Sequence, residues 1–451
     1  MRLKLLTVAL ALAACPMLVQ AEDLLDAYRQ ARANDPVLSQ ADSTRLSIGE
    51  NVVQSRALLL PQVSAQLSLS QTQVAGPTPT VDTNGNVITP DTGYGRTRDL
   101  NATVSQSVLD FSKYANLKAA HSAADSQTAT YEAALQQLAS RVATAYFGVL
   151  TSDDALTFAK ANEQALARQL EQAQQRFDVG LSAITDVQDA KAQHDSSVAA
   201  VITAENTLSD AREALTQITG KPADNLKKLR EQLPMDAPAP NDAKAWVEEA
   251  VQKNPTILAS QFNVESAEHT IDSARAGHLP TIDATAQYGR SSSWNERGGL
   301  TAATRAANGR GATTVGLTLS VPIFSGGATQ SRVRQSIYER DAAQDSLEAS
   351  RRQVVRDTLN YFRSVVAGIS QVEATKAAVE SSESARDATQ AGFEVGTRTI
   401  VDVLIAQQNL TQALSNYSQA RHQFILNKLL LKQTAGTVDI KDLEAINSLL
   451  Q

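Results

Sequence analysis

The sequence is poor in cysteine, in aromatic residues and in uncompensated positive charge. Its one cysteine is Cys15, so disulfides contribute nothing to the chain beyond the leader. Aromatic residues make up 4% of the chain against 42% for all hydrophobic residues, which disfavours compact cores built on large buried rings. The 41 lysines and arginines are outnumbered by 48 aspartates and glutamates, and an acidic chain without a basic stripe is a poor nucleic-acid binder. Alanine, leucine and glutamine are abundant instead, and they favour long, closely packed helices.

Motifs for catalysis, for a cofactor or for a metal are also missing. The sequence has no glycine-rich phosphate loop and no plausible set of serine, histidine and aspartate for nucleophilic catalysis. Its histidines are scattered without metal-ligand spacing. These are His121, His194, His269, His278 and His422. We therefore expect no catalytic residue, no cofactor and no metal, and we expect the protein not to be an enzyme.

Residues 1–21 have the features of a secretory signal peptide. Arg2 and Lys4 form a basic start, an apolar run follows, and a small-residue cleavage site ends at Ala21. The apolar run is too short for a membrane anchor, because a spanning helix needs about 20 apolar residues. Cleavage would leave Glu22 as the first residue. It would also change the formal net charge from −7 to −9, because 39 positive residues would remain against 48 negative ones.

A second interpretation of the leader stays open. The stretch "LAAC" at 12–15 is similar to a bacterial lipoprotein signal, in which Cys15 would carry lipid. Mass spectrometry of the mature N-terminus would separate the two interpretations.

The chain repeats itself at a spacing of 213–219 residues. The matching stretches are "RALLLP" (56–61) with "RAGHLP" (275–280), "VLDFS" (108–112) with "VPIFS" (321–325), and "AYF" (145–147) with "NYF" (360–362). This self-similarity predicts a tandem duplication, with a first repeat at 22–218 and a second at 255–435. Residues 219–254 connect the repeats, and 436–451 form a tail.

Each repeat contains two segments in which apolar and polar residues alternate, the pattern of strands. We predict strands at about 62–74, 98–110, 281–293 and 312–324, joined by exposed loops at 71–97 and 294–310. The apolar positions include Val63, Leu67, Leu69, Leu100, Ala102, Val104, Val108, Ile282, Ala284, Ala286, Val315, Leu317 and Leu319. Aromatic residues near the ends of the strands are expected at membrane interfaces. These are Phe111, Phe324, Tyr94, Tyr288 and Trp294.

The strands suit a membrane barrel better than a sheet over a soluble core. Their second face is uniformly polar, and no amphipathic helix of matching length remains to cover the apolar face. Four strands cannot close a barrel, and a sheet that spans a membrane has no open edge. Several chains must therefore contribute strands.

Long helices follow the strands. Residues 113–178 contain no proline and one glycine, and a heptad seam through positions 114 and 117 has 15 apolar members of 19. At 1.5 Å per residue such a helix spans roughly 100 Å. A second long helix is expected at 328–394. Return helices at 184–218 and 400–434 are expected to pack antiparallel against them, after the twin turns "DVGLSAITDVQDAKA" (178–192) and "EVGTRTIVDVLIAQQ" (394–408).

The sequence resembles the TolC-like outer membrane efflux and type I secretion channels over essentially the whole mature chain. The likeness lies in the start "EDLLDAYRQARANDP", both Leu-Pro junctions, the twin turns and the tail "GTVDIKDLEAINSLL". The resemblance implies an α+β membrane protein in which three chains of four strands form a twelve-stranded β-barrel in the outer membrane. It also implies that the antiparallel coiled-coil helices form a periplasmic α-barrel, with 219–254 and 436–451 as an equatorial belt.

The resemblance implies partners and a role as well. A homotrimer in outer membrane lipid would pair with a periplasmic adaptor and an inner-membrane ABC or RND transporter. It would export drugs, toxins or secreted proteins. Two alternatives remain, a lipid-anchored RND-type drug efflux channel of the same fold and a periplasmic coiled-coil adaptor.

The same resemblance gives roles to residues of the twin turns. Asp402 would form a ring of three carboxylates at the entrance, whereas the family's second acidic position is Ile405 here. Thr185, Asp186 and Arg398 match positions that tie neighbouring helix pairs and hold the entrance shut. The further tie from a tyrosine in the best-known member cannot form, because Phe393 has no hydroxyl. The surfaces expected to meet the adaptor are Val179, Gly180, Leu181, Val395, Gly396 and Thr397.

Plainer interpretations of these turn residues stay open. Thr399 and Asp402 have the spacing of a helix-start capping box. Arg398 would otherwise be a solvated residue, and the glycines would serve the turn alone.

Overall fold

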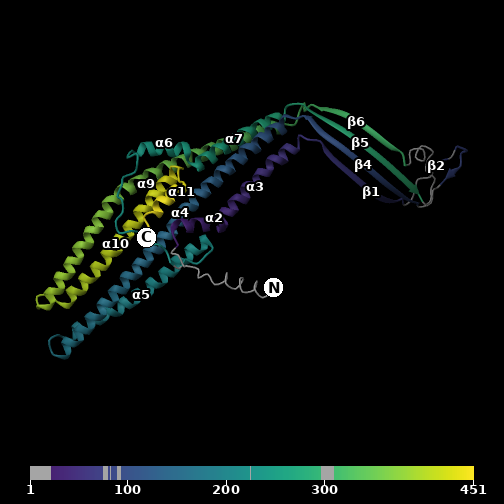
Figure 1. The fold of residues 1–451 in the computed structure, drawn as a ribbon. Helices are drawn as coiled ribbons and strands as arrows, with labels where there is room; N and C mark the ends of the chain where they lie inside the picture. The colour runs from purple at the N-terminus through teal and green to yellow at the C-terminus, as the bar shows by residue number, and fades with distance from the viewer. Residues whose placement is uncertain (1–21, 75–79, 82, 89–92, 224, 296–308) are drawn as a thin grey trace, which may run out of the picture. The chain divides into compact units, whose positions relative to one another are not determined.

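The structure is a computed structural model, and it describes residues 22–451 except 75–79, 82, 89–92, 224 and 296–308. The expected signal segment with Cys15, parts of both predicted loops and the side chains of Tyr94 and Trp294 lie outside the described residues. The chain forms two compact units (Figure 1). Unit 1 contains residues up to Ser43, 129–258 and 349–451, and unit 2 contains 44–128 and 259–348.

The helices and strands alternate along the chain in two similar series. They are α2 Leu24–Asn34, α3 Pro36–Ala57, β1 Gln62–Val74, β2 Thr80–Val81, β3 Val87–Ile88, β4 Gly93–Leu109, α4 Phe111–Asp178, α5 Ile184–Thr219, α6 Ala243–Lys253, α7 Pro255–Ala276, β5 Thr281–Asn295, β6 Gly311–Ser320, α9 Ala328–Glu394, α10 Ile400–Thr434 and α11 Ile440–Asn447. Both series read helix, helix, two long strands and a helical hairpin, as the duplication predicts.

Several boundaries differ from those expected. β6 ends at Ser320 rather than near 324, since Pro322 has no N–H to donate to a ladder. The loops are shorter than predicted, because β4 begins at Gly93 and β5 continues to Asn295. Phe111 is the first residue of α4. The connecting segment 219–254 also contains a helix, α6.

Unit 2 contains an antiparallel four-stranded sheet in the order β1-β4-β5-β6. Its register places Val63 opposite Val104, Val104 opposite Ala286 and Ala286 opposite Val315, so one apolar row crosses the whole sheet. The neighbouring row is polar. It contains Ser64, Thr103, Gln287 and Thr314. In the single chain the apolar side chains stay exposed, with Val63 at 75% and Val315 at 77%.

A β-bulge changes the predicted alternation in β4. The pairing with β5 shifts between Ser107 and Leu109, and Leu109 rather than Val108 lies opposite Ile282. Val108 is therefore the extra residue of the bulge, and Leu109 is the residue that pairs with the apolar row of β5. The extra residue of the bulge moves the row to Leu109.

The predicted heptad seam of α4 is buried or half-buried along most of unit 1 but displaced in unit 2. Its fully buried members in unit 1 are Leu138, Val142, Val149, Leu166 and Ala173. In unit 2, Ala115 is buried while Tyr114 is 49% exposed. The hydroxyl of Ser126 donates to the carbonyl oxygen of Ala259 in α7 at 2.8 Å. Small residues thus bring the backbones of α4 and α7 close together, and the contact face shifts by one residue.

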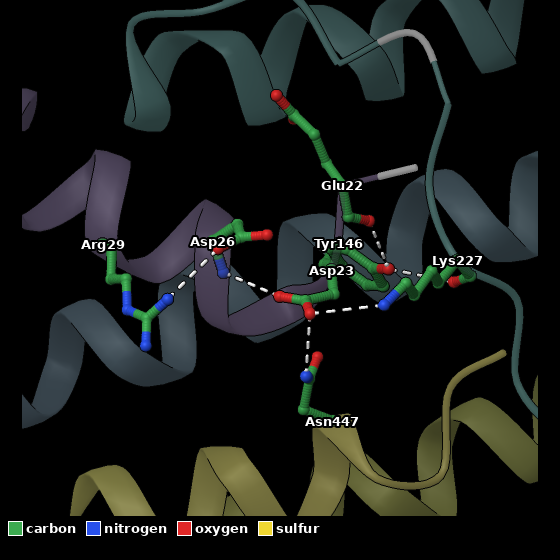
Figure 2. Close-up of polar contacts among 7 residues, drawn as sticks. All are labelled: Glu22, Asp23, Asp26, Arg29, Tyr146, Lys227 and Asn447. Atoms are coloured by element: carbon green, nitrogen blue, oxygen red, sulfur yellow. Dashed lines mark hydrogen bonds and ion pairs between the residues drawn. The ribbon is translucent and has the colours of Figure 1, made fainter. Parts of the chain in front are cut away.

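In unit 1 the start of the described chain is fixed by a buried tyrosine. Tyr146 of α4 has no exposed surface, and its hydroxyl lies 3.2 Å from the carbonyl oxygen of Glu22 and 2.9 Å from that of Lys227. Burial raises the pKa of Tyr146, so it remains a neutral donor. Figure 2 shows these contacts.

Asp23 connects three segments of the same region (Figure 2). Its carboxylate caps α2 by accepting from the N–H of Asp26 at 2.9 Å, and it also accepts from the side chains of Asn447 at 3.0 Å and Lys227 at 3.5 Å. Burial opposes the charge, but these bonds together lower the pKa of Asp23. The α2 start, the segment after α5 and helix α11 are therefore held by one carboxylate.

A buried ion pair docks the α2–α3 junction on α4. Arg141 donates from both terminal nitrogens to Asp35 at 3.0 and 3.1 Å, and the Asp35 side chain is 1% exposed. The second repeat lacks this pair. Asn254 stands at the matching junction and donates to the carbonyl oxygen of Thr434, while Arg356, 215 residues after Arg141, is 72% exposed. The two repeats thus dock their short helices differently.

We predict that Arg141→Met lowers the stability of unit 1, because it leaves the Asp35 carboxylate buried without its partner. Hydrogen bonds to a charged group contribute about 1.5–3 kcal/mol. The thermal midpoint of the detergent-solubilised protein should therefore fall by several degrees. Arg356→Met is the matched control and should unfold like the parent. An equal loss in both variants would contradict the prediction.

Candidate functional site at the two helix turns

The first turn, between α4 and α5, is built by backbone hydrogen bonds. Gly180 has φ +79°, its N–H donates to the carbonyl oxygen of Phe177 at 2.9 Å, and the N–H of Leu181 donates to that of Arg176 at 2.8 Å. This pair of bonds around a left-handed residue is a Schellman ending of a helix. The space around Gly180 is open, so its backbone conformation alone favours glycine.

The second turn, between α9 and α10, has the same construction. Gly396 has φ +80° and donates to the carbonyl oxygen of Phe393 at 3.1 Å, and Thr397 donates to that of Gly392 at 2.8 Å. Both turns lie at one end of unit 1 (Figure 1). The expected tip residues are all exposed there, including Val179 at 69%, Leu181 at 76% and Val395 at 75%.

Asp402, in the first turn of α10, forms a complete capping box with the N-cap residue Thr399. Its carboxylate accepts from the N–H of Thr399 at 2.9 Å and from its hydroxyl at 2.8 Å, while the N–H of Asp402 donates to that hydroxyl oxygen at 3.3 Å. The bond from the Thr399 N–H, then that from its hydroxyl, and the nearby Arg398 charge lower the pKa of Asp402. The carboxylate is therefore ionised at neutral pH. The capping role is confirmed, and the pore role stays a prediction.

The gate residues of the first turn are arranged differently. Helix α5 has Ala183 as its N-cap residue and therefore no side-chain cap, and Asp186 accepts from the hydroxyl of Ser182 at 2.9 Å. Thr185 is exposed. Among the described residues of this single chain, Arg398 makes no hydrogen bond to Thr185 or Asp186. Ties between neighbouring chains therefore remain a prediction.

The residue type of Phe393 does not by itself predict the contacts that its side chain makes. Its ring packs against Leu166 of α4 and against Ile400 and Leu404 of α10. The guanidinium carbon of Arg176 lies 4.5 Å from the ring centroid. Arg176 was not predicted as a site residue. The one available signal was its place in the last turn of α4, where a cation is common.

Polar contacts join α4 to α10 along the hairpins. The hydroxyl of Thr151 lies 2.8 Å from Nδ1 of His422, Ser418 donates to Asp154 at 2.6 Å, and Thr411 donates to Asn162 at 3.1 Å. Burial lowers the pKa of His422 to about 4, against the opposing effect of Asp154. His422 is thus a neutral packing residue.

The described part of the chain contains neither a candidate metal site nor a helix suited to crossing a membrane. No group of histidine, cysteine, aspartate or glutamate there is arranged to hold a metal ion. No helix within those residues combines the length and the apolar character needed to cross a membrane.

Two helical hairpins with twin turns, joined to a four-stranded sheet with an exposed apolar face, define the class of outer membrane channels that continue into the periplasm. The chain belongs to the outer membrane efflux protein family, whose model matches residues 27–221 and 246–437. The two matched ranges correspond to the two repeats.

Known proteins resemble this chain over almost its whole length. It is 37% identical to the outer membrane protein TolC of Escherichia coli (strain K12) over 454 residues, covering 98% of this chain and 88% of that protein. It is 27% identical over 437 residues to the alkaline protease secretion protein AprF of Pseudomonas aeruginosa, covering 94% and 86%. The fold matches the Campylobacter jejuni CmeC outer membrane channel with a TM-score of 0.79 at 17% identity, covering 95% and 90%. The protein is an outer membrane channel for efflux and secretion.

Proposed function

We propose that three copies of the chain form the channel. The observation that carries this proposal is the sheet of unit 2, which has an apolar face and whose strands β1 and β6 are each paired on one side only within the described residues. A spanning sheet needs closed edges. Three such sheets joined edge to edge give a twelve-stranded barrel with the apolar rows toward lipid and the polar rows toward the lumen.

The helical hairpins of the three chains would continue this barrel as a periplasmic tunnel. The residues 219–254 and 436–451 would surround its middle. The protein would then act by passage of a solute and not by a chemical reaction, so we expect no enzyme activity.

The exposed turns are the proposed contact for a periplasmic adaptor. Apolar side chains protrude from both, and exposed apolar groups at a rigid turn favour recognition by another protein. An inner-membrane ABC or RND transporter would supply the cargo through that adaptor. Secreted proteins are a supported class of cargo, because the relative AprF is an alkaline protease secretion protein. Drugs and toxins are the other proposed cargo.

The same turns are the proposed entrance and gate. Asp402 of three chains would form one carboxylate ring, with Ile405 in place of a second ring. Arg398 of one chain would bind Thr185 and Asp186 of its neighbour and hold the helical hairpins inward. An exposed arginine suits this role, since its planar fork can bridge a hydroxyl oxygen and a carboxylate.

The assembly makes a direct prediction. The protein should leave the outer membrane only with detergent and should run at three times the mature mass, because single sheets expose their apolar rows. Analytical ultracentrifugation or light scattering with correction for detergent gives the mass. A monodisperse, water-soluble monomer would contradict the proposal.

A further inference from the structure

The helical hairpins of one chain meet near the twin turns through one arginine and one phenylalanine. Arg176 belongs to α4, and its guanidinium carbon lies 4.5 Å from the centroid of Phe393 in α9. A guanidinium within about 6 Å of an aromatic centroid is attracted by the ring's electron density. The contact therefore joins the first hairpin to the second.

The backbone carbonyl groups of both residues take part in the hydrogen bonds that build their turns. The carbonyl oxygen of Arg176 accepts the N–H of Leu181, and that of Phe393 accepts the N–H of Gly396. Each side chain thus starts from a fixed point beside its turn. A displacement of one turn relative to the other must separate the cation from the ring.

The cation lies over the ring although carboxylates are close in sequence. Three of these carboxylates accept hydrogen bonds from glutamines of their own helices. The pairs are Gln175 with Glu171, Gln174 with Asp178, and Gln390 with Glu394. Within the described part of the chain, Arg176 forms no ion pair. Phe393 is therefore its main partner.

An apolar contact lies under the same ring. Leu166 of α4, 5% exposed, and Ile400 and Leu404 of α10, 2% and 6% exposed, form a small cluster against which Phe393 packs. Arg176 covers the ring on the α4 side. The two hairpins thus share an apolar contact, and the guanidinium of Arg176 lies over it.

We infer that the Arg176–Phe393 contact holds the two hairpins of each chain together at the turns, so that Arg176 is a positioning residue of the closed entrance. This inference rests on the proposed gate. Phe393 has no hydroxyl and so cannot make the tie to Asp186 within one chain. The inference gives Arg176 the role of connecting the two hairpins of that chain instead. Three copies of the contact act in a trimer, beside the proposed ties from Arg398 between chains.

Single-channel recording of purified trimers in planar bilayers tests the inference. Arg176→Ala should raise the resting conductance several-fold, and Phe393→Leu should do the same because it removes the ring but keeps apolar bulk. The double variant should conduct no more than the stronger single variant, since both changes remove one contact. Arg176→Lys should retain more closure than Arg176→Gln, and this comparison remains if alanine lowers the trimer yield.

Matched variants make the result specific. Arg168→Ala removes an exposed arginine two turns earlier in α4 and should conduct like the parent. Phe393→Tyr keeps the ring and should conduct no more than the parent. Trimer yield and thermal midpoint should be unchanged in Arg168→Ala and Arg176→Lys.

The variant Arg398→Ser, recorded in parallel, separates the possible failures. If Arg398→Ser leaks and Arg176→Ala conducts like the parent, the inference is overturned and the gate stands. If neither leaks, the proposed gate fails and the inference fails with it. If the leaks of Arg176→Ala and Phe393→Leu multiply in the double variant, the residues act separately and the contact is not the tie.

Discussion

Trimers in which serine replaces Arg398 are expected to conduct several-fold more at rest than the parent. Arg398 is exposed at the second turn and makes no tie to Thr185 or Asp186 within the described part of one chain, so its proposed partners lie in the neighbouring chain. A hydrogen bond to a charged group contributes about 1.5–3 kcal/mol, and three-fold symmetry repeats it. Its loss should shift the equilibrium toward outward-swung hairpins without affecting folding.

Single-channel recordings at low and moderate salt provide the measurement. The conductance gap between parent and variant should narrow as salt rises, because screening already weakens an exposed ionic tie in the parent. Phe393→Tyr is the opposite change, since its hydroxyl would restore the tie to Asp186 that the family resemblance implies and should lower the leak. If Arg398→Ser conducts like the parent at both salt concentrations, Arg398 is a solvated residue and does not close the channel.

Removal of the Asp402 carboxylate should abolish the cation preference of the closed channel. The capping bonds from Thr399 lower the pKa of Asp402, so three negative charges would face one axis at neutral pH in the proposed trimer. Like charges near one axis favour a shared counter-ion, which predicts weak block by multivalent cations. Reversal potentials in a salt gradient should show cation preference in the parent and little in Asp402→Asn.

Asparagine is the appropriate replacement, because its side-chain oxygen still accepts the capping bonds while the charge is removed. Ile405→Asp tests the missing second ring. Ile405 is 52% exposed, so an aspartate is tolerated there, and block by multivalent cations should strengthen. Anion preference in the parent, or unchanged selectivity in Asp402→Asn, would contradict the assignment.

Acidification gives a second measurement of the same ring. A carboxylate whose pKa is lowered stays charged below the usual aspartate range and is neutralised only as the pH falls through the lowered value. The cation preference should therefore persist at pH 5 and disappear only in strong acid. Loss of selectivity near pH 6 would assign it to another group.

The elements that repeat with a regular period were predictable from the sequence. Alternation along residues 62–74 gave β1, and glycine after a long apolar seam gave both turns, because each pattern depends on local geometry alone. The bulge at Val108 was not predictable, since it is defined by the partner strand. The one-residue shift at Ala115 likewise depends on the close approach of α7.

The candidate site was predictable to the same degree. The glycines and the capping box at Asp402 follow from residue types within a few positions. The contact between Arg176 and Phe393 joins residues more than 200 positions apart, and neither residue type specifies the other. The Asp35–Arg141 pair was also missed, because its two residues are far apart in the sequence. The second repeat has no equivalent pair that could have indicated it.

The construction of the turns has a consequence for the evolution of partner choice. Backbone N–H groups and one glycine fix each turn, whereas the exposed side chains of Val179, Leu181 and Val395 make little contribution to its shape. Substitutions at these positions should therefore have little effect on the stability of the turn. The two turns of one chain can change independently. If both turns bind an adaptor as proposed, a duplicated turn of this kind lets a channel acquire a new adaptor at one turn while the other keeps the old one.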